Sequence, residues 1–446
     1  MNNELTRGPV LKSLLWFAIP MILGDLLYQC YNVADTLIVG RFLGADALAA
    51  VGSAFSLMTF LTSILLGLSM GSGVVFSIRY GQGDIQGLKE RIYASFLLLA
   101  GVTVVLNILV FAGTDWIIWF MKVPDEIQGY MKDYLVVIFA GLAGIFLYNY
   151  FASLLRALGN SKVPLLFLAV SAILNIFLDL WFVLGLKRGV AGAAEATVIS
   201  QYVSGIGIAV YAFLKFPLIR PQGEKIRIRL SCMKEIISFS ALTCIQQSVM
   251  NLGILMVQGR VNSFGPAVMA AFAAAVKIDA FAYMPVQDFG NAVSTFIAQN
   301  YGAGQEERIR KGLKYSILTS MAFCLFITAG IWLLARPLML LFVDAGETAI
   351  IAEGGRYLHI EGTFYCGIGC LFLLYGLYRA VGKPGMSVVL TIISLGTRVV
   401  LAYALSAIPE IGVVGIWWSV PIGWFLADLT GLAYYWKKRH TLFRIR

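Results

Sequence analysis

Apolar runs of about 20 residues recur along almost the whole chain, from Leu14 to the last run near Tyr435. A helix needs roughly 20 apolar residues to cross the about 30 Å of hydrocarbon in a bilayer. Of the 446 residues, 59% are hydrophobic and 13% are charged, so the chain is too apolar to cover itself with a water-soluble surface. The runs and the composition together predict an integral membrane protein.

The apolar runs predict helices and not the strands of a membrane barrel. Barrel strands alternate apolar and polar residues over about ten positions, whereas the stretches 97–113 and 317–334 are apolar on every face. The first run is longer than the core of a signal peptide, about 7 to 15 residues, and is expected to be retained. We expect an all-α fold with twelve transmembrane helices, near residues 14–38, 48–74, 93–113, 133–154, 163–184, 190–213, 235–258, 267–291, 315–335, 357–378, 386–406 and 411–435.

Positive charges indicate how these helices are oriented. With the N-terminus inside, the inner segments carry 24 of the 34 Lys and Arg residues, the outer segments carry 8, and Lys277 and Arg398 lie within helices. An excess on the inner side is typical of multi-pass proteins. It predicts a protein of the cytoplasmic membrane with both termini in the cytoplasm. It also accounts for the net charge of +10 without nucleic acid as a partner, and membrane lipids are the secondary partner of these charges.

The sequence contains one long internal repeat. Tyr-Gly-Gln-Gly-Asp at 80–84 returns 221 residues later as Tyr-Gly-Ala-Gly-Gln at 301–305. Arg-Ala-Leu-Gly at 156–159 returns 223 residues later as Arg-Ala-Val-Gly at 379–382. A repeat of this length predicts two related halves of six helices each.

A basic segment separates the two halves. We expect an N-terminal lobe at 1–213, a cytoplasmic linker at 214–234 and a C-terminal lobe at 235–446. An even number of helices in each half makes the repeats parallel, related by an axis along the membrane normal. This predicts two six-helix bundles around a central cavity, an architecture found in transporters that rock one lobe against the other.

The chain lacks the residues that several kinds of catalytic and metal sites require. The chain has two histidines, too few for imidazole metal sites or a Ser-His-Asp triad, and its six cysteines lack metal-type spacing. The glycine-rich turns at 81–83 and 302–304 lack the GxxxxGK[ST] pattern, so we expect tight helix-to-helix turns there. The sequence predicts a protein that is not an enzyme, has no cofactor and draws on an ion gradient if it pumps.

Four motifs, in order along essentially the whole chain, carry a family resemblance. They are Val-Ala-Asp-Thr-Leu-Ile-Val-Gly at 33–40, the paired Tyr-Gly-x-Gly turns, the paired Arg-Ala-x-Gly motifs and Gly-Val-Ala-Gly-Ala-Ala at 189–194. Together they resemble the multidrug and toxic compound extrusion (MATE) family. The resemblance implies a MATE-type fold and the export of cationic or amphiphilic organic compounds in exchange for Na+ or H+.

Acidic residues inside the expected helices are candidates for a functional site, because a charge in hydrocarbon costs at least about 2.5 kcal/mol. Asn175 and Asp179 stand four residues apart and therefore share one helix face. Asp35, Asp179 and Thr197 lie about five to seven residues below the outer ends of their helices. At 1.5 Å per residue, all three sit roughly 8 to 10 Å beneath the surface, so the four side chains can share one layer.

Two carboxylates, an amide and a hydroxyl suit a hard cation such as Na+, and two close carboxylates would equally hold one proton. The alternative is that these side chains only hydrogen-bond between helices. The repeat bears on this choice, because a purely architectural need would appear in both halves. The corresponding residues of the second half are Met256, Arg398, Ala402 and Val420. The difference favours a cation-binding or coupling role in the first half.

The family resemblance implies the same role. Asp in the first helix, Asn-x-x-x-Asp in the fifth and Thr in the sixth resemble the N-lobe cation site of DinF-like and archaeal-type members. Members that are NorM-like instead place acids in helices seven and ten. At those places this chain has the uncharged residues Gln246, Gln247 and Ile368. A NorM-type site is therefore not expected, and acidic chemistry is expected only in the first half.

Other polar residues within the helices are accessory candidates. Lys277 and Asp279, two residues apart, point to nearly opposite faces and cannot neutralise each other. Each either borders the cavity or pairs with another helix, for which Arg398 is one candidate. Glu195 lies two residues from Thr197 and is expected to miss the cation layer.

Two residues are expected to be solvated, because helix ten is predicted to begin beside them on the outer side. They are His359 and Glu361. Methionine and aromatic side chains along the helices are expected to pack against lipid or neighbours more often than to line a substrate site.

Two rival functions remain at this stage. A lipid-linked saccharide flippase would favour several cationic residues around the cavity, and here only Lys277 and Arg398 are available. A membrane-embedded lipid enzyme would need a clustered nucleophile, metal ligands or a general base. The expected partners are small organic substrates, and a monomer is the default state.

Overall fold

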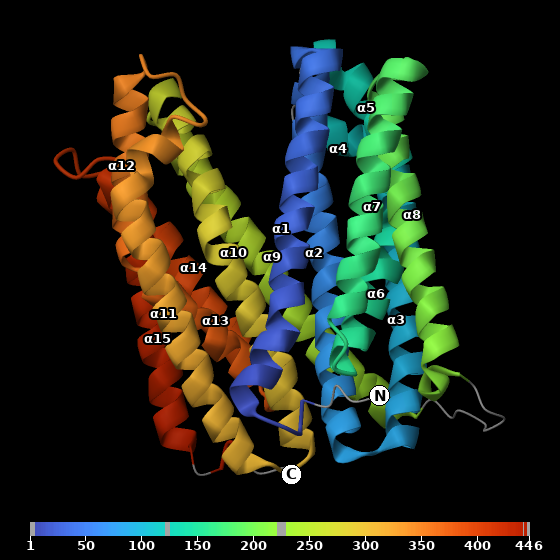
Figure 1. Cartoon of the computed structure of the whole chain (residues 1–446). Helices are drawn as coiled ribbons and strands as arrows, with labels where there is room; N and C mark the ends of the chain where they lie inside the picture. The colour runs from blue at the N-terminus through green and yellow to red at the C-terminus, as the bar shows by residue number, and fades with distance from the viewer. Residues whose placement is uncertain (1–4, 121–124, 221–228, 440, 444–446) are drawn as a thin grey trace. The chain divides into compact units, whose positions relative to one another are not determined.

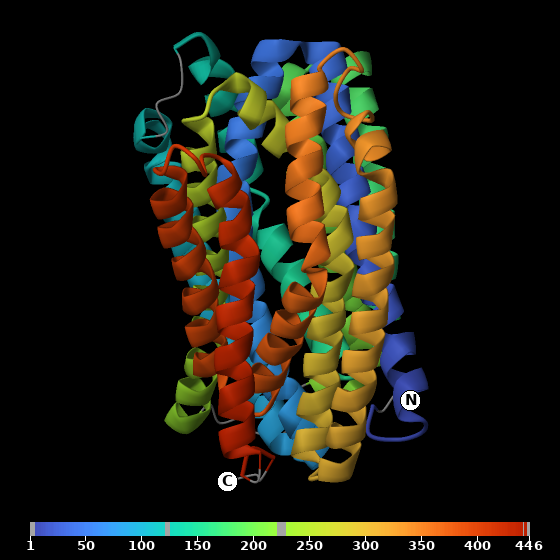
Figure 2. The same ribbon diagram turned by 90° about the vertical axis from the view of Figure 1, so that its left-hand side faces the viewer.

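In the computed structural model, all regular elements among the described residues are helices. The structure describes residues 5–120, 125–220, 229–439 and 441–443. The helices run lengthwise within each part of the molecule (Figure 1; Figure 2). The elements are α1 (Val10–Leu43), α2 (Ala45–Gln82), α3 (Ile85–Ala112), α4 (Thr114–Phe120), α5 (Asp125–Phe139), α6 (Leu142–Ala157), α7 (Lys162–Leu180), η1 (Trp181–Gly185), α8 (Gly189–Lys215), η2 (Pro217–Ile219), α9 (Leu230–Asn262), α10 (Pro266–Gly302), α11 (Glu306–Met339), α12 (Thr348–Thr363), α13 (Tyr365–Ala380), α14 (Pro384–Ser406) and α15 (Val414–Lys438).

Most of these helices are long and apolar enough to cross a membrane. Among the described residues, nine helices meet this condition by length and composition, and eleven spans result if two bent pairs each count as one. The helix α15 occupies the position of the twelfth expected span. Many helices extend past the predicted ends, as α2 does to Gln82, because apolar runs mark only the hydrocarbon part of a helix.

Two of the spans are bent where the helix is interrupted. The helices α5 and α6 meet at 44°, and α12 and α13 meet at 53°. The Tyr202 hydroxyl donates to the Ala140 carbonyl at the first break, at 2.8 Å. The Thr328 hydroxyl donates to the Gly362 carbonyl near the second, at 2.6 Å. Neighbouring helices thus satisfy backbone groups that the breaks leave without a helical partner.

The chain divides into two compact units. The first unit contains Leu23–Cys244, and the second contains Leu5–Ile22 together with Ile245–Arg446. The division therefore falls inside α1 and inside α9. Of the segment expected as a linker, 221–228 lies outside the described residues, and α8 occupies its beginning up to Lys215.

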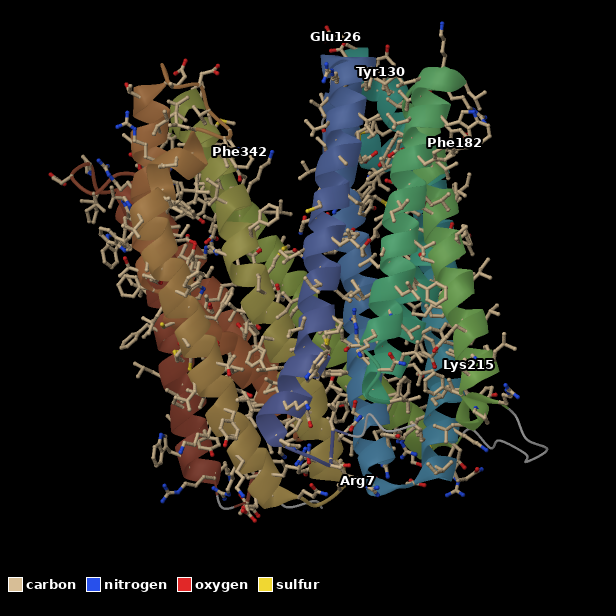
Figure 3. All side chains as sticks on the ribbon, in the orientation of Figure 1. Arg7, Glu126, Tyr130, Phe182, Lys215 and Phe342 are labelled. Atoms are coloured by element: carbon tan, nitrogen blue, oxygen red, sulfur yellow. The ribbon has the colours of Figure 1, made fainter. Side chains whose placement is uncertain are left out.

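The helices of each unit run between two ends, and the connecting turns lie at both of them (Figure 3). In the first unit, Glu126 and Tyr130 lie at one end and Lys215 at the other (Figure 3). In the second unit, Phe342 and Arg7 likewise lie at opposite ends (Figure 3). The helices alternate in direction between these ends, as the predicted succession of inner and outer segments requires.

Small residues bring α2 and α9 together in the first unit. Gly67 and Gly71 form a GxxxG pair, and a Cβ atom built on Gly71 would lie 2.5 Å from the Phe239 carbonyl oxygen. The hydroxyl groups of Ser72 and Ser240 are 2.9 Å apart in the same contact. Close approach of backbones through glycine is a common way to hold helices together in lipid.

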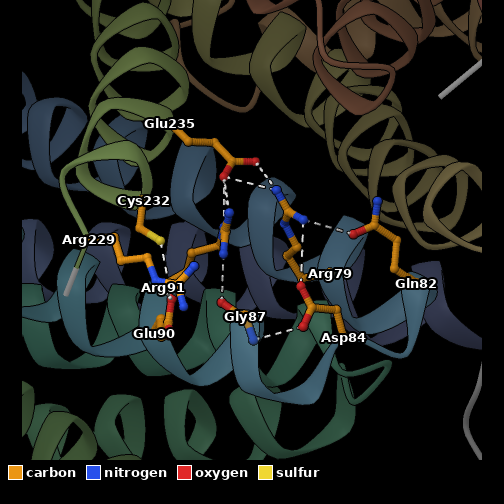
Figure 4. Close-up of polar contacts among 9 residues, drawn as sticks. All are labelled: Arg79, Gln82, Asp84, Gly87, Glu90, Arg91, Arg229, Cys232 and Glu235. Carbon is orange, nitrogen blue, oxygen red and sulfur yellow. Dashed lines mark hydrogen bonds and ion pairs between the residues drawn. The ribbon is translucent and has the colours of Figure 1, made fainter. Parts of the chain in front are cut away.

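An ion-pair network holds the beginning of α9 in the first unit (Figure 4). The Glu235 carboxylate accepts hydrogen bonds from Arg79 at 3.0 Å and from Arg91 at 2.7 Å. The Glu90 carboxylate lies 3.9 Å from the Arg229 guanidinium. Because two arginines share one carboxylate, this network fixes α9 against the turn between α2 and α3 more firmly than a single surface pair would.

The two glycine-rich motifs form tight turns, as predicted. Gly83 and Gly304 adopt φ angles of 72° and 68°, a left-handed conformation that favours glycine. Asp84 is the N-cap of α3, and its carboxylate accepts a hydrogen bond from the Gly87 amide at 2.9 Å. The geometry is that of a helix end followed directly by a capped helix start.

Candidate functional site: a buried carboxylate pair

The helices α7 and α8 place three of the predicted residues side by side. The Asn175 amide donates to the Thr197 hydroxyl at 3.3 Å, and one turn away the Ser171 hydroxyl donates to the Ser200 carbonyl at 2.9 Å. Asp179 follows Asn175 by one helical turn and is fully buried, with 0% of its side chain exposed. The expected sharing of one face by Asn175 and Asp179 is therefore seen in the structure.

Asp35 of α1 brings a second carboxyl group to this place. The carboxyl groups of Asp35 and Asp179 are direct neighbours and act on each other electrostatically. The structure thus forms two pairs from the four predicted residues, Asp35 with Asp179 and, one helical turn away along α7, Asn175 with Thr197.

The oxygens of this cluster have few donors. Among the described residues, no hydrogen bond reaches either oxygen of Asp179, one oxygen of Asp35 or the oxygen of Asn175, although all these atoms are buried. Buried acceptors without donors are costly, and two facing carboxylates also repel each other. A proton shared by the pair, or a cation held between the oxygens, would remove both costs.

The chemistry of the donors fits a hard cation. Carboxylate, amide and hydroxyl oxygens are the ligands that such cations prefer. Among the described residues, no group of three or more His, Cys, Asp and Glu side chains is placed to hold a metal ion. The Asp35–Asp179 cluster is not such a group, because it contains only two acidic side chains; its other oxygens come from one amide and one hydroxyl.

The surroundings of the pair include features that the sequence analysis did not find. Tyr134 of α5 and Tyr31 of α1 lie close enough to interact electrostatically with both carboxyl groups. The π-helical turn η1 begins two residues after Asp179. Such turns interrupt α-helical packing and are frequent at functional sites. Tyr134 lies in an apolar helix whose sequence has no motif or spacing that distinguishes this residue from its neighbours, so the sequence carries no signal for it.

The predicted accessory residue Glu195 has a partner of its own. Its carboxylate forms an ion pair with the Arg188 guanidinium at 2.9 Å. Both residues lie near the beginning of α8 and both are partly exposed. Glu195 thus lies outside the Asp35–Asp179 pair, as expected.

The second unit contains a buried acidic cluster that was not expected. Asp279 of α10 and Glu361 of α12 interact with each other and with Arg398 of α14. The Tyr365 hydroxyl donates to the Asp279 carboxylate at 2.7 Å. The prediction that Asp279 pairs with another helix, with Arg398 as a candidate partner, agrees with this arrangement.

One expectation about the second half is wrong. Glu361 is 1% exposed and not solvated, because α12 begins at Thr348 and residue 361 lies about 20 Å along the helix. His359 is partly buried, and its ring stacks on that of Trp332 at 4.6 Å. The first half is therefore not alone in burying acidic groups, since Asp279 and Glu361 form a second pair.

The remaining candidates differ in exposure. Lys277 is exposed while Asp279 is buried, in agreement with their predicted opposite faces. Gln247 of α9 is 8% exposed and lies in the second unit. The sequence analysis did not single out Asp25 of α1 or Asp428 of α15, although both fall within expected spans, and Asp428 is 8% exposed.

The chain matches known proteins over nearly its full length. The MatE family model matches residues 20–181 and 240–404. The sequence is 29% identical to the probable multidrug resistance protein YpnP of Bacillus subtilis (strain 168), with 97% of each chain covered. The fold matches a solved MOP superfamily transporter from Pyrococcus furiosus, with a TM-score of 0.93, 24% identity and 99% of each chain covered.

A second solved structure gives the same result. It is an outward-facing multidrug resistance MATE family transporter, matched with a TM-score of 0.92, 24% identity and 99% coverage of each chain. These likenesses confirm the predicted twelve-helix transmembrane fold.

Proposed function

Because the chain belongs to the MatE family, we propose that it exports cationic or amphiphilic organic compounds in exchange for Na+ or H+. As a member of this family it is a membrane-embedded, multi-pass multidrug efflux transporter and not an enzyme. The exchange of ions, its coupling residues and alternating access of the two halves are the proposed part.

The observation that carries the proposal is the buried pair of carboxyl groups with unpaired oxygens. Asp179 is completely buried, and none of its oxygens receives a hydrogen bond from the described residues. A buried carboxyl pair of this kind favours a bound cation or proton, so the site differs in energy between its ion-bound and ion-free states. Ion binding can therefore favour one state of the transporter over the other, which is what coupling requires.

We assign the coupling site to Asp35, Asn175, Asp179 and Thr197. The Asn175 amide and the Thr197 hydroxyl are already hydrogen-bonded to each other, so they present their remaining oxygen lone pairs in a fixed geometry. Both Na+ and H+ fit this donor set, and each would displace the other from it. The proposed mechanism requires the coupling ion, Na+ or H+, and no organic cofactor.

The location and partners follow from the same reasoning. We propose a monomer in the cytoplasmic membrane, with both termini in the cytoplasm and small organic compounds as substrates. The rival flippase function would call for several cations at the substrate site. Lys277 is exposed, and Arg398 lies beside Asp279 and Glu361, so neither residue supports that alternative.

The test is transport of a fluorescent organic cation by purified protein in proteoliposomes. A sodium gradient and a proton gradient are imposed separately, with vesicles that lack protein as the control. We expect one of the two gradients to drive accumulation against the concentration difference. Equal, gradient-independent movement of the dye under every condition would contradict ion coupling.

A first prediction concerns orientation. Gln82→Cys and Gln305→Cys, placed at the two glycine-rich turns of a cysteine-free variant, should resist an impermeant maleimide in intact cells and react after lysis. Asp344→Cys, in the loop before α12, should react in intact cells. Labelling of either turn from outside would overturn the proposed topology.

A second prediction concerns Gln247. Gln247→Ala should leave ion coupling largely intact while changing which compounds are carried, because an amide side chain does not exchange a proton near neutral pH. The measurement is the ratio of transported cation to coupling ion in proteoliposomes. Loss of coupling as complete as that of an Asp35 variant would show that the site extends into the second unit.

A further inference from the structure

A groove lies on the surface of the second unit, where α11, α12 and α15 come together. Its volume is about 750 Å³, enough for a small molecule or for part of a lipid. It lies toward the end of the unit that carries Phe342 (Figure 3), because α11 ends and α12 begins there. Its lining residues are Trp332, Ala335, Arg336, Thr348, Ile351, Ala352, Gly355, Arg356, His359, Ile360, Thr363, Phe364 and Trp418.

The charge of this groove is one-sided. Its described lining contains two arginines and a histidine but no acidic residue. Within the part of the chain that the structure describes, the Arg336 side chain has no hydrogen bond or ion pair, and it is exposed. Arg356 forms an ion pair with Glu353 at 3.3 Å, and Glu353 also accepts a hydrogen bond from Trp417 at 2.7 Å. The Glu353 carboxylate thus offsets the charge of Arg356 alone, and the mouth of the groove keeps a net positive charge.

The two arginines come together because of the register between α11 and α12. The rings of Trp332 and His359 stack at 4.6 Å, and the Trp332 indole donates to the Thr363 hydroxyl at 3.1 Å. The two helices run in opposite directions. Arg336 is therefore one turn beyond Trp332, and Arg356 is one turn beyond His359, toward the same end. Both arginines line the groove and therefore lie on the same side of the stacked rings.

The floor of the groove is apolar and aromatic. The rings of Phe364 and Trp418 are in edge contact at 5.6 Å, and Ile351 and Ile360 also line the groove. Trp332 is 56% exposed and Trp418 is 41% exposed. Tryptophan at the end of a transmembrane helix is typical of the membrane interface, where the ring contacts both acyl chains and headgroups.

We propose that this groove binds an anionic phospholipid, with its phosphodiester between Arg336 and Arg356 and an acyl chain along Trp332, Phe364 and Trp418. Guanidinium groups bind phosphate oxygens in pairs, which gives both affinity and orientation. An uncharged lipid would leave the arginines unpaired, and a free phosphate would not use the aromatic floor. The ligand therefore combines a negative headgroup with a hydrocarbon chain.

The test uses tryptophan fluorescence of the protein in phosphatidylcholine bilayers. Phosphatidylglycerol or phosphatidylcholine with brominated chains is added at equal mole fractions, since bromine quenches tryptophan on contact. The wild type should be quenched more strongly by the brominated phosphatidylglycerol. Trp332→Phe combined with Trp418→Phe should remove this excess, because these two rings line the groove.

Charge variants identify the headgroup site. Arg336→Gln combined with Arg356→Gln should weaken the apparent affinity for phosphatidylglycerol by about fivefold for each arginine removed. The matched control is Lys132→Gln with Lys187→Gln. Lys132 is paired with Asp115 at 2.7 Å, Lys187 has no ion pair with any residue that the structure describes, and both lie in the first unit. The control should keep the wild-type preference.

Several outcomes would overturn the proposal. They are equal quenching of the wild type by both lipids, an excess that survives in the arginine variant, and an equal loss in the lysine control. Inorganic phosphate in excess should leave the quenching unchanged, and displacement by it would identify a simple anion site instead. If the arginine variant does not fold, an excess that persists in the tryptophan variant still refutes the site.

Discussion

Replacing Asp179 by asparagine is expected to abolish gradient-driven efflux, to the level of liposomes without protein, and Asp35→Asn is expected to do the same. Asparagine keeps the shape of the side chain and part of its hydrogen bonding but removes the charge. A proton or sodium ion would then have one carboxylate to bind and not two. Without differential ion binding, the gradient can no longer bias the conformational cycle.

The two substitutions should also be non-additive. Because both carboxyl groups belong to one site, the double variant should be little worse than either single one. Transport is measured in proteoliposomes under each gradient, and folding is measured by monodispersity and thermal stability in detergent. Asp133→Asn is the control, since it removes an exposed acid from α5 of the same unit.

A purely structural role for the pair makes different predictions. It expects poor expression, lower thermal stability and roughly additive losses. Relief of repulsion between the carboxyl groups should instead leave the asparagine variants at least as stable as the wild type. Monodisperse Asp179→Asn protein that concentrates substrate at the normal rate under every gradient would refute the assignment.

Gly71→Ala is expected to destabilise the protein by about 1 to 3 kcal/mol, because the new methyl group has no room. A Cβ at this position would lie 2.5 Å from backbone atoms of both Phe239 and Ser240, where real contacts are not found. The helices α2 and α9 would have to separate. That movement would also break the hydrogen bond between Ser72 and Ser240.

The control for this prediction is Gly101→Ala in α3. A Cβ there meets no atom within 4 Å, so the substitution should be neutral or stabilising by up to about 1 kcal/mol, as alanine favours the helix. Thermal unfolding in detergent measures both variants. Equal stability of Gly71→Ala and Gly101→Ala would show that the backbones of α2 and α9 are not in contact.

The cluster in the first unit was predictable because helical geometry is regular. Counting residues from the outer ends of three helices predicts Asp35, Asp179 and Thr197 at one depth. In the structure Asp35 lies beside Asp179, and Thr197 lies beside Asn175 one helical turn away. Tyr134 was not predictable in this way. It comes from a helix that is broken near its middle, and the position of a break depends on packing between helices and not on apolar runs.

The error at Glu361 has the same origin. The apolar run predicts that helix ten begins at residue 357, whereas α12 begins at Thr348, in a stretch where polar and small residues interrupt the apolar ones. Such residues are compatible with a helix whose inner face is covered by other helices. Hydropathy therefore predicts the beginning of this helix about two turns too late in the chain. For this reason Glu361 is predicted to be solvated, although it is buried.

The two broken spans lie at corresponding positions in the two halves of the chain. The break between α5 and α6 and the break between α12 and α13 fall at equivalent places of the internal repeat, about 223 residues apart. A bend present at equivalent places in both copies belongs to the six-helix plan that the two halves share. The carboxyl pair of Asp35 and Asp179 occurs in one copy only, so the two copies have diverged in chemistry while keeping the same bend.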